Sequence, residues 1–201
     1  MSAKTLWTPA NIVTCARVAL VPFWLLLTQF LGMSLAESCL IPGFKLGSFI
    51  VFVVYVLISL TDKLDGYLAR SRNEVTTFGK FLDPIADKLA VVVALFVLLE
   101  WHMISPWVLL IIVAREFLVS GLRMIVASKG VVVAASNLGK WKTAITMIAI
   151  CGFLFLPCLP TGEIQNVLHI CFRIAMWISV ILTAWSGLDY FTQSWRYIVE
   201  V

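Results

Sequence analysis

Charged residues are scarce in this sequence. They make up only 13% of the 201 residues, whereas 61% are hydrophobic, and the mean hydropathy is +0.99. A soluble protein does not need so much apolar surface to build a core, so the composition predicts a single integral membrane domain over residues 1–201. The net charge is only +4, and no nucleic-acid partner is expected.

Cysteine and histidine patterns typical of metal sites are also absent. The five cysteines show no CxxC spacing, and the two histidines fall at the opposite ends of the predicted spans from the aspartates of residues 62–87. Cys39 and Cys158 are predicted to lie in loops on one side, where a disulfide between them is one option. The N-terminus lacks the pattern of a cleaved secretory signal, so the first apolar segment is expected to remain as an anchor.

Long apolar runs separated by polar loops predict an all-α fold with six transmembrane helices. A short amphipathic helix that ends near Pro9 is expected to lie at the membrane interface before them. Asn11, Thr14 and Arg17 then recur at a spacing of three, which places them on one helical face. The predicted spans are about 12–35, 46–70, 83–101, 106–127, 140–158 and 164–189, followed by a short tail.

The loop charges predict the orientation of these spans. Both termini and the loops near residues 70–80 and 128–142 carry most of the lysines and arginines, whereas the opposite loops carry only Lys45. By the positive-inside rule, both termini and the loop that follows the second span face the cytoplasm. The chain is therefore expected to be a multi-pass protein of the cell (inner) membrane.

Four of the 11 acidic residues gather where the second span ends and the third begins. Asp62 and Asp65 share one helical face, and Asp83 and Asp87 share a face of the next helix. Because a short loop joins the two helices, they are expected to be antiparallel neighbours, the second starting with Asp83 as N-cap and Pro84 as first helical residue. Four converging carboxylates would repel by roughly several kcal/mol without cations. Their oxygens suit Mg²⁺, Mn²⁺ or Ca²⁺, and four acids are enough for two metals.

Small residues and an arginine accompany these acids. Gly66 and Ala69 leave room beside Asp65, and Arg70 lies about two turns past Asp62, on the same side. Such a gap beside metals and an arginine fits a diphosphate that carries a flat base. In the alternative interpretation, the acids are ordinary interfacial charges that pair with Lys63, Arg70, Lys80 and Lys88.

The whole stretch resembles the signature of the CDP-alcohol phosphotransferase family. The matching pattern is Asp62-x-x-Asp65-Gly66-x-x-Ala69-Arg70, eight residues, then Gly79-x-x-x-Asp83-x-x-x-Asp87. The face that carries Asn11, Thr14 and Arg17 is similar to the family's N-terminal pattern, although Ala10 separates Pro9 from Asn11. The resemblance implies a six-helix membrane fold, usually a homodimer, with a polar cavity open to the cytoplasm.

The same resemblance implies roles for the matching residues. Asp87 would be the general base of the reaction. The two divalent cations, Mg²⁺ or Mn²⁺, would be bound by Asp62, Asp65, Asp83 and Asp87. The CDP group would be bound by Asp62, Gly66, Ala69, Arg70 and Gly79.

A second, basic cluster is expected to bind the acceptor. Arg115 and Arg123 are eight residues apart on one face of the fourth span, and Lys140 and Lys142 open the fifth. These cations fit an acceptor that carries a phosphate, unless they only pair with Glu116 or with headgroups. The stretches AREFLVSGLR and LGKWKT resemble the branch of the family that makes phosphatidylglycerol phosphate. That resemblance implies sn-glycerol 3-phosphate as acceptor, CDP-diacylglycerol as donor and a single displacement that releases CMP.

Two other functions remain open at this point. A transferase of the same family could use inositol phosphate or phosphatidylglycerol as its acceptor. A divalent-cation transporter is the more distant alternative, disfavoured because the acids lie at the inner ends of the helices rather than at mid-membrane. Arg173, in the sixth span, has no predicted partner and could meet an outer headgroup.

Overall fold

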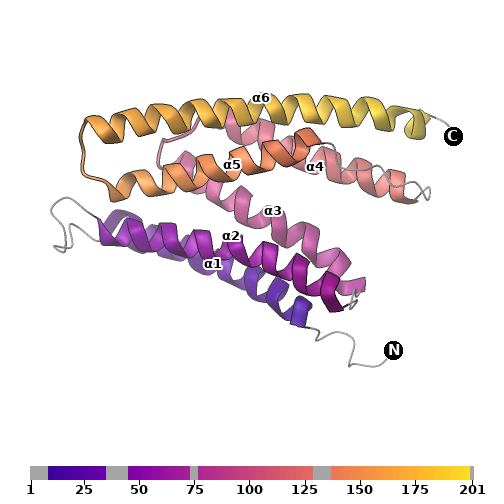
Figure 1. The fold of residues 1–201 in the computed structure, drawn as a ribbon, viewed down its shortest axis with the longest axis horizontal. Coiled ribbons are helices and arrows are strands. Elements are labelled where there is room, and N and C mark those ends of the chain that lie inside the picture. The colour runs from indigo at the N-terminus through magenta and orange to yellow at the C-terminus, as the bar shows by residue number, and fades with distance from the viewer. Residues whose placement is uncertain (1–8, 35–44, 73–76, 129–136, 200–201) are drawn as a thin grey trace. The chain divides into compact units, whose positions relative to one another are not determined.

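The computed structural model is helical throughout the elements that it describes (Figure 1), which confirms the predicted all-α fold. The helices are α1 (Pro9–Ser34), α2 (Leu46–Arg72), α3 (Thr77–Glu100), α4 (Pro106–Ser128), α5 (Asn137–Phe155), the 3₁₀ turn η2 (Leu156–Cys158) and α6 (Glu163–Val199). The structure describes residues 9–34, 45–72, 77–128 and 137–199. Within these ranges, the side chains outside the description are those of residues 9–10, 32–34, 62–72, 77–84, 87, 127–128, 137–138, 140 and 196–199.

The chain divides into two compact units. Unit 1 consists of Met1–Val97 and Leu154–Gln165, and unit 2 consists of Leu98–Phe153 and Asn166–Val201. The acidic stretch falls in unit 1 and the basic cluster in unit 2.

Unit 1 is built on the pairing of α1 with α2. The indole N–H of the buried Trp24 donates a hydrogen bond to the Val51 carbonyl (2.9 Å), and its ring lies 5.1 Å from that of Tyr55. Val21 and Ile58 are also buried, which extends the packed face along both helices. The apolar spacing of three and four residues in each helix therefore forms the contact between them.

The turn η2 packs against the start of α2 in the same unit. The rings of Phe52 and Phe155 lie 5.3 Å apart, and the Lys45 N–H donates to the Cys158 carbonyl (3.3 Å). Cys158 is a buried free cysteine. The disulfide with Cys39 that the sequence left as an option is therefore not supported, Cys39 itself lying outside the described residues.

Unit 2 is held together by α6. The hydroxyls of Thr146 in α5 and Ser179 in α6 form a buried hydrogen bond. Gly152 lets the two helices approach closely, because a Cβ at this position would lie 2.3 Å from the ring of Phe172. Close approach through a small residue, with hydroxyls bonded across the contact, is the usual way in which helices associate in membranes.

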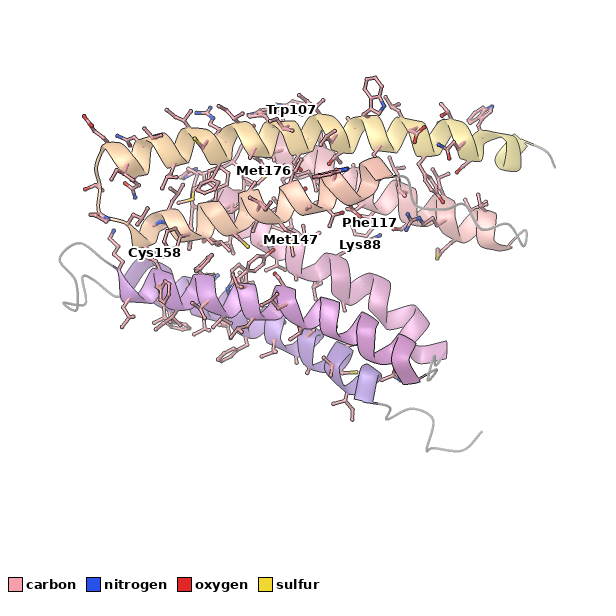
Figure 2. All side chains as sticks on the ribbon, viewed as in Figure 1. Lys88, Trp107, Phe117, Met147, Cys158 and Met176 are labelled. Atoms are coloured by element: carbon pink, nitrogen blue, oxygen red, sulfur yellow. The ribbon has the colours of Figure 1, made fainter. Side chains whose placement is uncertain are left out.

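Apolar surface remains exposed along α6, as expected for a membrane protein. Ile181, Trp185 and Leu188 are more than 60% exposed, and Figure 2 shows side chains on the side of α6 that is turned away from α5. By length and composition, three stretches among the described residues could cross a membrane: Asn11–Leu31, Trp141–Cys158 and Glu163–Trp195. Leu46–Thr61 is a shorter apolar helix.

The third helix begins earlier than the sequence predicted. α3 starts at Thr77, so Asp83 and Pro84 lie inside the helix and the prediction of Asp83 as N-cap was wrong. The prediction relied on the missing N–H of proline, which costs roughly 3 kcal/mol inside a helix. Residues 77–82, TFGKFL, nevertheless continue the helix upstream, since proline within an apolar helix is tolerated where neighbouring groups compensate.

The last two helices also differ from their predicted bounds. α5 begins at Asn137, before the predicted start at residue 140, and α6 continues to Val199, where a short tail was predicted after residue 189. Residues 190–199, YFTQSWRYIV, contain neither glycine nor proline, so nothing in them ends the helix. The predicted tail is in fact a helical extension.

Candidate active site

The acidic stretch lies on two consecutive helices of unit 1. Its first part, Asp62, Asp65, Gly66, Ala69 and Arg70, lies in the C-terminal half of α2, as predicted. Its second part, Gly79, Asp83 and Asp87, lies in α3. The side chains of all these residues are outside the described part of the structure, so the convergence of the four carboxylates stays a prediction.

The donor set of the acidic stretch fits a hard divalent cation. Its four aspartates supply carboxylate oxygens, the ligands that Mg²⁺ and Mn²⁺ prefer. Among the side chains that the structure describes, no group of three or more histidine, cysteine, aspartate or glutamate residues could hold a metal ion. No described group therefore competes with the acidic stretch as the metal site.

The polar face of α1 packs beside the start of the acidic stretch. Asn11, Thr14 and Arg17 are all buried, which confirms that they share one inward face. The Arg17 Nε donates to the Thr61 hydroxyl at 3.5 Å, and Thr61 immediately precedes Asp62 in α2. The predicted N-terminal pattern thus reaches the helix that carries the first two aspartates.

Arg115 anchors the basic cluster in unit 2. Its Nη2 donates to the Ser186 hydroxyl in α6 at 2.6 Å, and its Nη1 lies 3.5 Å from a carboxylate oxygen of Glu116. The side chain is only 14% exposed. Its Nε is buried without a hydrogen-bond partner among the described residues, so one donor of the guanidinium remains available.

Lys142 joins the cluster from α5. Its ammonium group donates to the same oxygen of Glu116, and the lysine side chain is only 5% exposed. Glu116 therefore links α4 to α5 through an ion pair. The side chain of Lys140 is outside the described residues, and its predicted part in the cluster is untested.

Arg123 lies further along α4 and faces α6. Its guanidinium carbon is 5.4 Å from the centre of the Tyr190 ring, within the range of a cation–π contact. Arg115 and Arg123 thus lie on the side of α4 that contacts α6, which confirms the shared face predicted from their spacing of eight residues.

A buried polar stripe on α6 completes the cluster and was not predicted. Ser179, Thr183, Ser186, Tyr190 and Ser194 are all buried. They follow one another at spacings of four, three, four and four residues, so they share one helical face. This spacing is visible in the sequence, but hydroxyl residues are common in membrane helices and carry no charge to mark them. The sequence indicated Glu116 only as a possible partner of the nearby cations, and it did not predict the ion pair that links α4 to α5.

The cluster has the composition of an anion site. Arg115 and Lys142 share the single carboxylate of Glu116, so one positive charge remains in excess at side chains that are only 14% and 5% exposed. The Thr183 hydroxyl and the Arg115 Nε have no hydrogen-bond partner among the described residues. Arginine presents several N–H donors in one plane and suits phosphate oxygens. The arrangement can therefore bind a phosphate group on a small acceptor.

Comparison with known proteins agrees with the motif. A family model described as CDP-alcohol phosphatidyltransferase matches residues 7–185. The chain is 41% identical over 190 residues to the CDP-diacylglycerol–glycerol-3-phosphate 3-phosphatidyltransferase of Bacillus subtilis (strain 168), covering 92% of this chain and 94% of the relative. Proteins of the same name from Rickettsia felis and Haemophilus influenzae are 40% and 35% identical, over 93% and 89% of this chain and 95% and 88% of their own lengths. The family predicted from the acidic stretch is thereby confirmed, and the chain belongs to the CDP-alcohol phosphatidyltransferase family.

Proposed function

We propose that this protein transfers the phosphatidyl group of CDP-diacylglycerol to sn-glycerol 3-phosphate, giving phosphatidylglycerol phosphate and CMP. The observation that carries the proposal is the buried basic cluster, which keeps an excess of positive charge and a free guanidinium donor for the acceptor's phosphate. The names of the relatives support the same pair of substrates. An uncharged acceptor would leave the excess positive charge of the cluster uncompensated, which is energetically costly.

The acidic stretch would bind the donor. Asp62, Asp65, Asp83 and Asp87 would hold two divalent cations, Mg²⁺ or Mn²⁺, which when bound supply positive charge for the diphosphate. Gly66, Ala69 and Gly79 leave room for the cytidine, and Arg70 and Asp62 complete the CDP site.

The reaction then needs one proton transfer and one displacement. Asp87 accepts the proton of the acceptor's primary hydroxyl, whose oxygen attacks the β-phosphorus of CDP-diacylglycerol in line. The new P–O bond forms as the bond to the CMP oxygen breaks, so no covalent intermediate with the protein is required. Precise placement of the attacking oxygen supplies much of the acceleration in such reactions.

The basic cluster would hold the acceptor by its phosphate. Arg115, Arg123, Lys140 and Lys142 supply the donors, and Glu116 orients the ammonium group of Lys142 through their ion pair. Glu116 acts on the acceptor through the lysine and is therefore a positioning residue.

The membrane arrangement follows from the same proposal. Six spans bring both termini to the cytoplasmic side, where glycerol 3-phosphate is dissolved. The acyl chains of the donor stay in the lipid of the cell membrane, and the protein works as a homodimer, as is usual in the family.

Purified protein with CDP-diacylglycerol and Mg²⁺ or Mn²⁺ tests the proposal through CMP release. The acceptor panel consists of sn-glycerol 3-phosphate, glycerol, inositol phosphate and phosphatidylglycerol. The highest kcat/KM is expected for glycerol 3-phosphate, with little release from glycerol, since glycerol lacks the phosphate that the cluster binds. Faster turnover with inositol phosphate or phosphatidylglycerol would contradict the assigned acceptor.

A further inference from the structure

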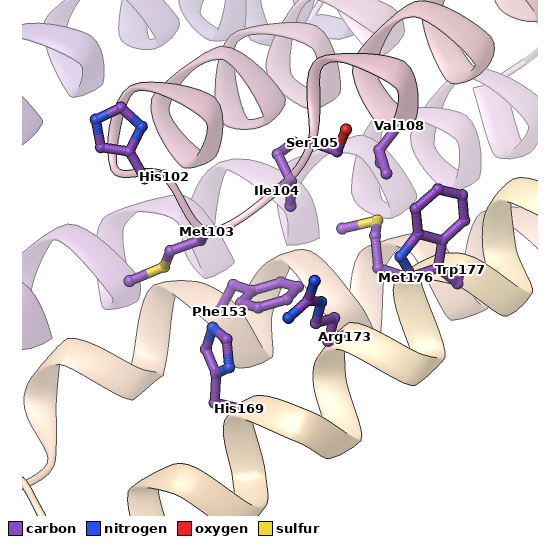
Figure 3. A pocket seen from close by; sticks show the side chains of 10 residues that line it. All are labelled: His102, Met103, Ile104, Ser105, Val108, Phe153, His169, Arg173, Met176 and Trp177. Carbon is purple, nitrogen blue, oxygen red and sulfur yellow. The ribbon is translucent and has the colours of Figure 1, made fainter.

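Unit 2 also contains a pocket that the transfer reaction does not use. Its volume is about 260 Å³, and it lies where the turn between α3 and α4 meets α5 and α6 (Figure 3). The turn contributes His102 and Ser105, α5 contributes Phe153, and α6 contributes His169, Arg173 and Trp177. Figure 3 shows the guanidinium of Arg173 beside the ring of Phe153, with His169 close by on the same helix.

The position of this pocket along α6 separates it from the basic cluster. Arg173 precedes Ser186 by 13 residues, which corresponds to roughly 20 Å of helix at 1.5 Å per residue. That distance is about two thirds of the hydrocarbon thickness of a bilayer, which is roughly 30 Å. The pocket and the cluster are therefore separate places along one helix.

The charge of the pocket is positive and uncompensated. Among the ten residues that line it, Arg173 is permanently charged and none is acidic. Within the described part of the chain, the Arg173 guanidinium makes no hydrogen bond or ion pair, unlike that of Arg115. An arginine in an apolar helix is costly unless an anion or water meets its donors.

The remaining surface of the pocket is apolar. Met103, Ile104, Val108 and Met176 line it. On α6, Ile170 and Ile174 flank Arg173 and are each 56% exposed, so apolar surface continues out of the pocket along the helix. A charged site that opens onto apolar surface fits a molecule with an anionic head and acyl chains, and it suits a free ion poorly.

We propose that this pocket binds the phosphate of an anionic phospholipid headgroup, with Arg173 as the main donor and the acyl chains lying against the exposed side of α6. The site is separate from the proposed transfer reaction. A bound lipid would satisfy the guanidinium donors that the protein leaves open and would hold the α3–α4 turn against α6.

Native mass spectrometry of the detergent-purified protein tests this proposal. The protein is mixed with equal amounts of phosphatidylglycerol and phosphatidylcholine that carry the same acyl chains, and the retained lipid is counted. Wild type is expected to retain phosphatidylglycerol preferentially, and Arg173→Gln to reduce that retention about 10-fold, since charge-assisted hydrogen bonds are lost. Arg173→Lys should keep part of it, because the charge stays while the planar fork of donors is lost.

Two control variants separate the pocket from general charge and from the transfer site. Lys45→Gln removes one positive charge from an exposed residue in unit 1, and Arg115→Gln alters the basic cluster. Both should retain phosphatidylglycerol as wild type does. Equal loss in Lys45→Gln, or unchanged retention in Arg173→Gln, would overturn the proposal. Displacement of the lipid by millimolar inorganic phosphate would identify a free anion as the ligand, and this result would also overturn the proposal. The experiment measures retained lipid and needs no turnover. A negative result would therefore contradict the lipid site without contradicting the proposed transfer reaction.

Discussion

The acidic stretch and the basic cluster differ in how far apart their like charges lie in the chain. The aspartates of the acidic stretch lie on two consecutive helices, α2 and α3, and the spacing within each pair puts its two members on one helical face. The basic cluster takes its cations from α4 and α5 and its neutral partners from α6, and those neighbours are far apart in the sequence. The first is local in the chain, whereas the second exists only through tertiary packing.

This difference predicts how the two regions respond to substitution. The four aspartates of the acidic stretch are proposed to depend on bound cations, so losing one should affect chemistry more than folding. In the basic cluster, Glu116 already balances part of the charge and ties two helices together. Changes there should mainly alter the KM of the acceptor and leave the KM of CDP-diacylglycerol nearly unchanged.

The largest effect is expected for Asp87→Asn. An amide cannot accept the acceptor's proton, so turnover should fall by about 10³-fold or more, whereas CDP-diacylglycerol should still bind. Steady-state CMP release and a separate measurement of donor binding check the two parts. Asp189→Asn, which changes an acid on α6 that accepts a hydrogen bond from Gln193, is the matched control and should turn over normally. Near-normal turnover in Asp87→Asn would rule out this residue as the general base.

Arg115→Gln should produce the next largest effect. It removes the guanidinium that contacts Ser186 and carries the spare donor, so kcat/KM for glycerol 3-phosphate should fall on the order of 10²-fold. The control is Arg173→Gln, which should leave kcat/KM for glycerol 3-phosphate within about twofold, since Arg173 lies roughly 20 Å along α6 from Ser186. If only the KM of CDP-diacylglycerol rose, Arg115 would have to be assigned to the nucleotide site instead of the acceptor site.

Lys140→Ala and Lys142→Gln should raise the KM of the acceptor by about 10-fold each, because each removes one charged donor to the phosphate. The KM of CDP-diacylglycerol should change much less. Initial rates measured over a grid of both substrates separate the two constants. If either variant instead raised the donor KM more, that lysine would belong with the acidic stretch.

The smallest effect is expected for Gly187→Ala. A Cβ at this position would lie 3.1 Å from the Arg115 Cγ, so the arginine must shift slightly, and the acceptor KM should rise roughly threefold. The helix itself should gain up to about 1 kcal/mol from the loss of a glycine. Gly121→Ala is the control, since a Cβ there meets no atom within 4 Å. An acceptor KM that rose equally in both variants would show that helix stiffness, rather than Arg115, is responsible.

Much of the molecule could be predicted from its sequence. Long uncharged runs predicted the helices, because apolar segments of that length must satisfy their backbone hydrogen bonds internally. The resemblance of the stretch from Asp62 to Asp87 to a known signature predicted the family, and the spacing within each aspartate pair placed it on one helical face. The shared faces of Asn11 with Arg17 and of Arg115 with Arg123 followed from the same periodicity.

The errors arose where a local signal competed with a longer helix. Asp83-Pro84 resembles a helix start, but α3 already begins at Thr77. The end of α6 was placed at residue 189 because the apolar run stops there, although nothing in residues 190–199 breaks a helix. A change from apolar to polar residues indicates where a helix leaves apolar surroundings. The helix itself ends only where residues such as glycine or proline interrupt its backbone.

The sequence by itself determined the fold class and the acidic stretch, because these depend on hydropathy and on spacing within a helix, and the motif in that stretch indicated the family by its resemblance. Only the tertiary structure decided which groups surround the cations. Arg115 lies against Ser186, and Lys142 pairs with Glu116, while Arg173 opens onto a pocket without an acidic residue. In the sequence, each of the three is a single cation within an apolar segment. The groups that surround each one come from helices that are distant in the chain.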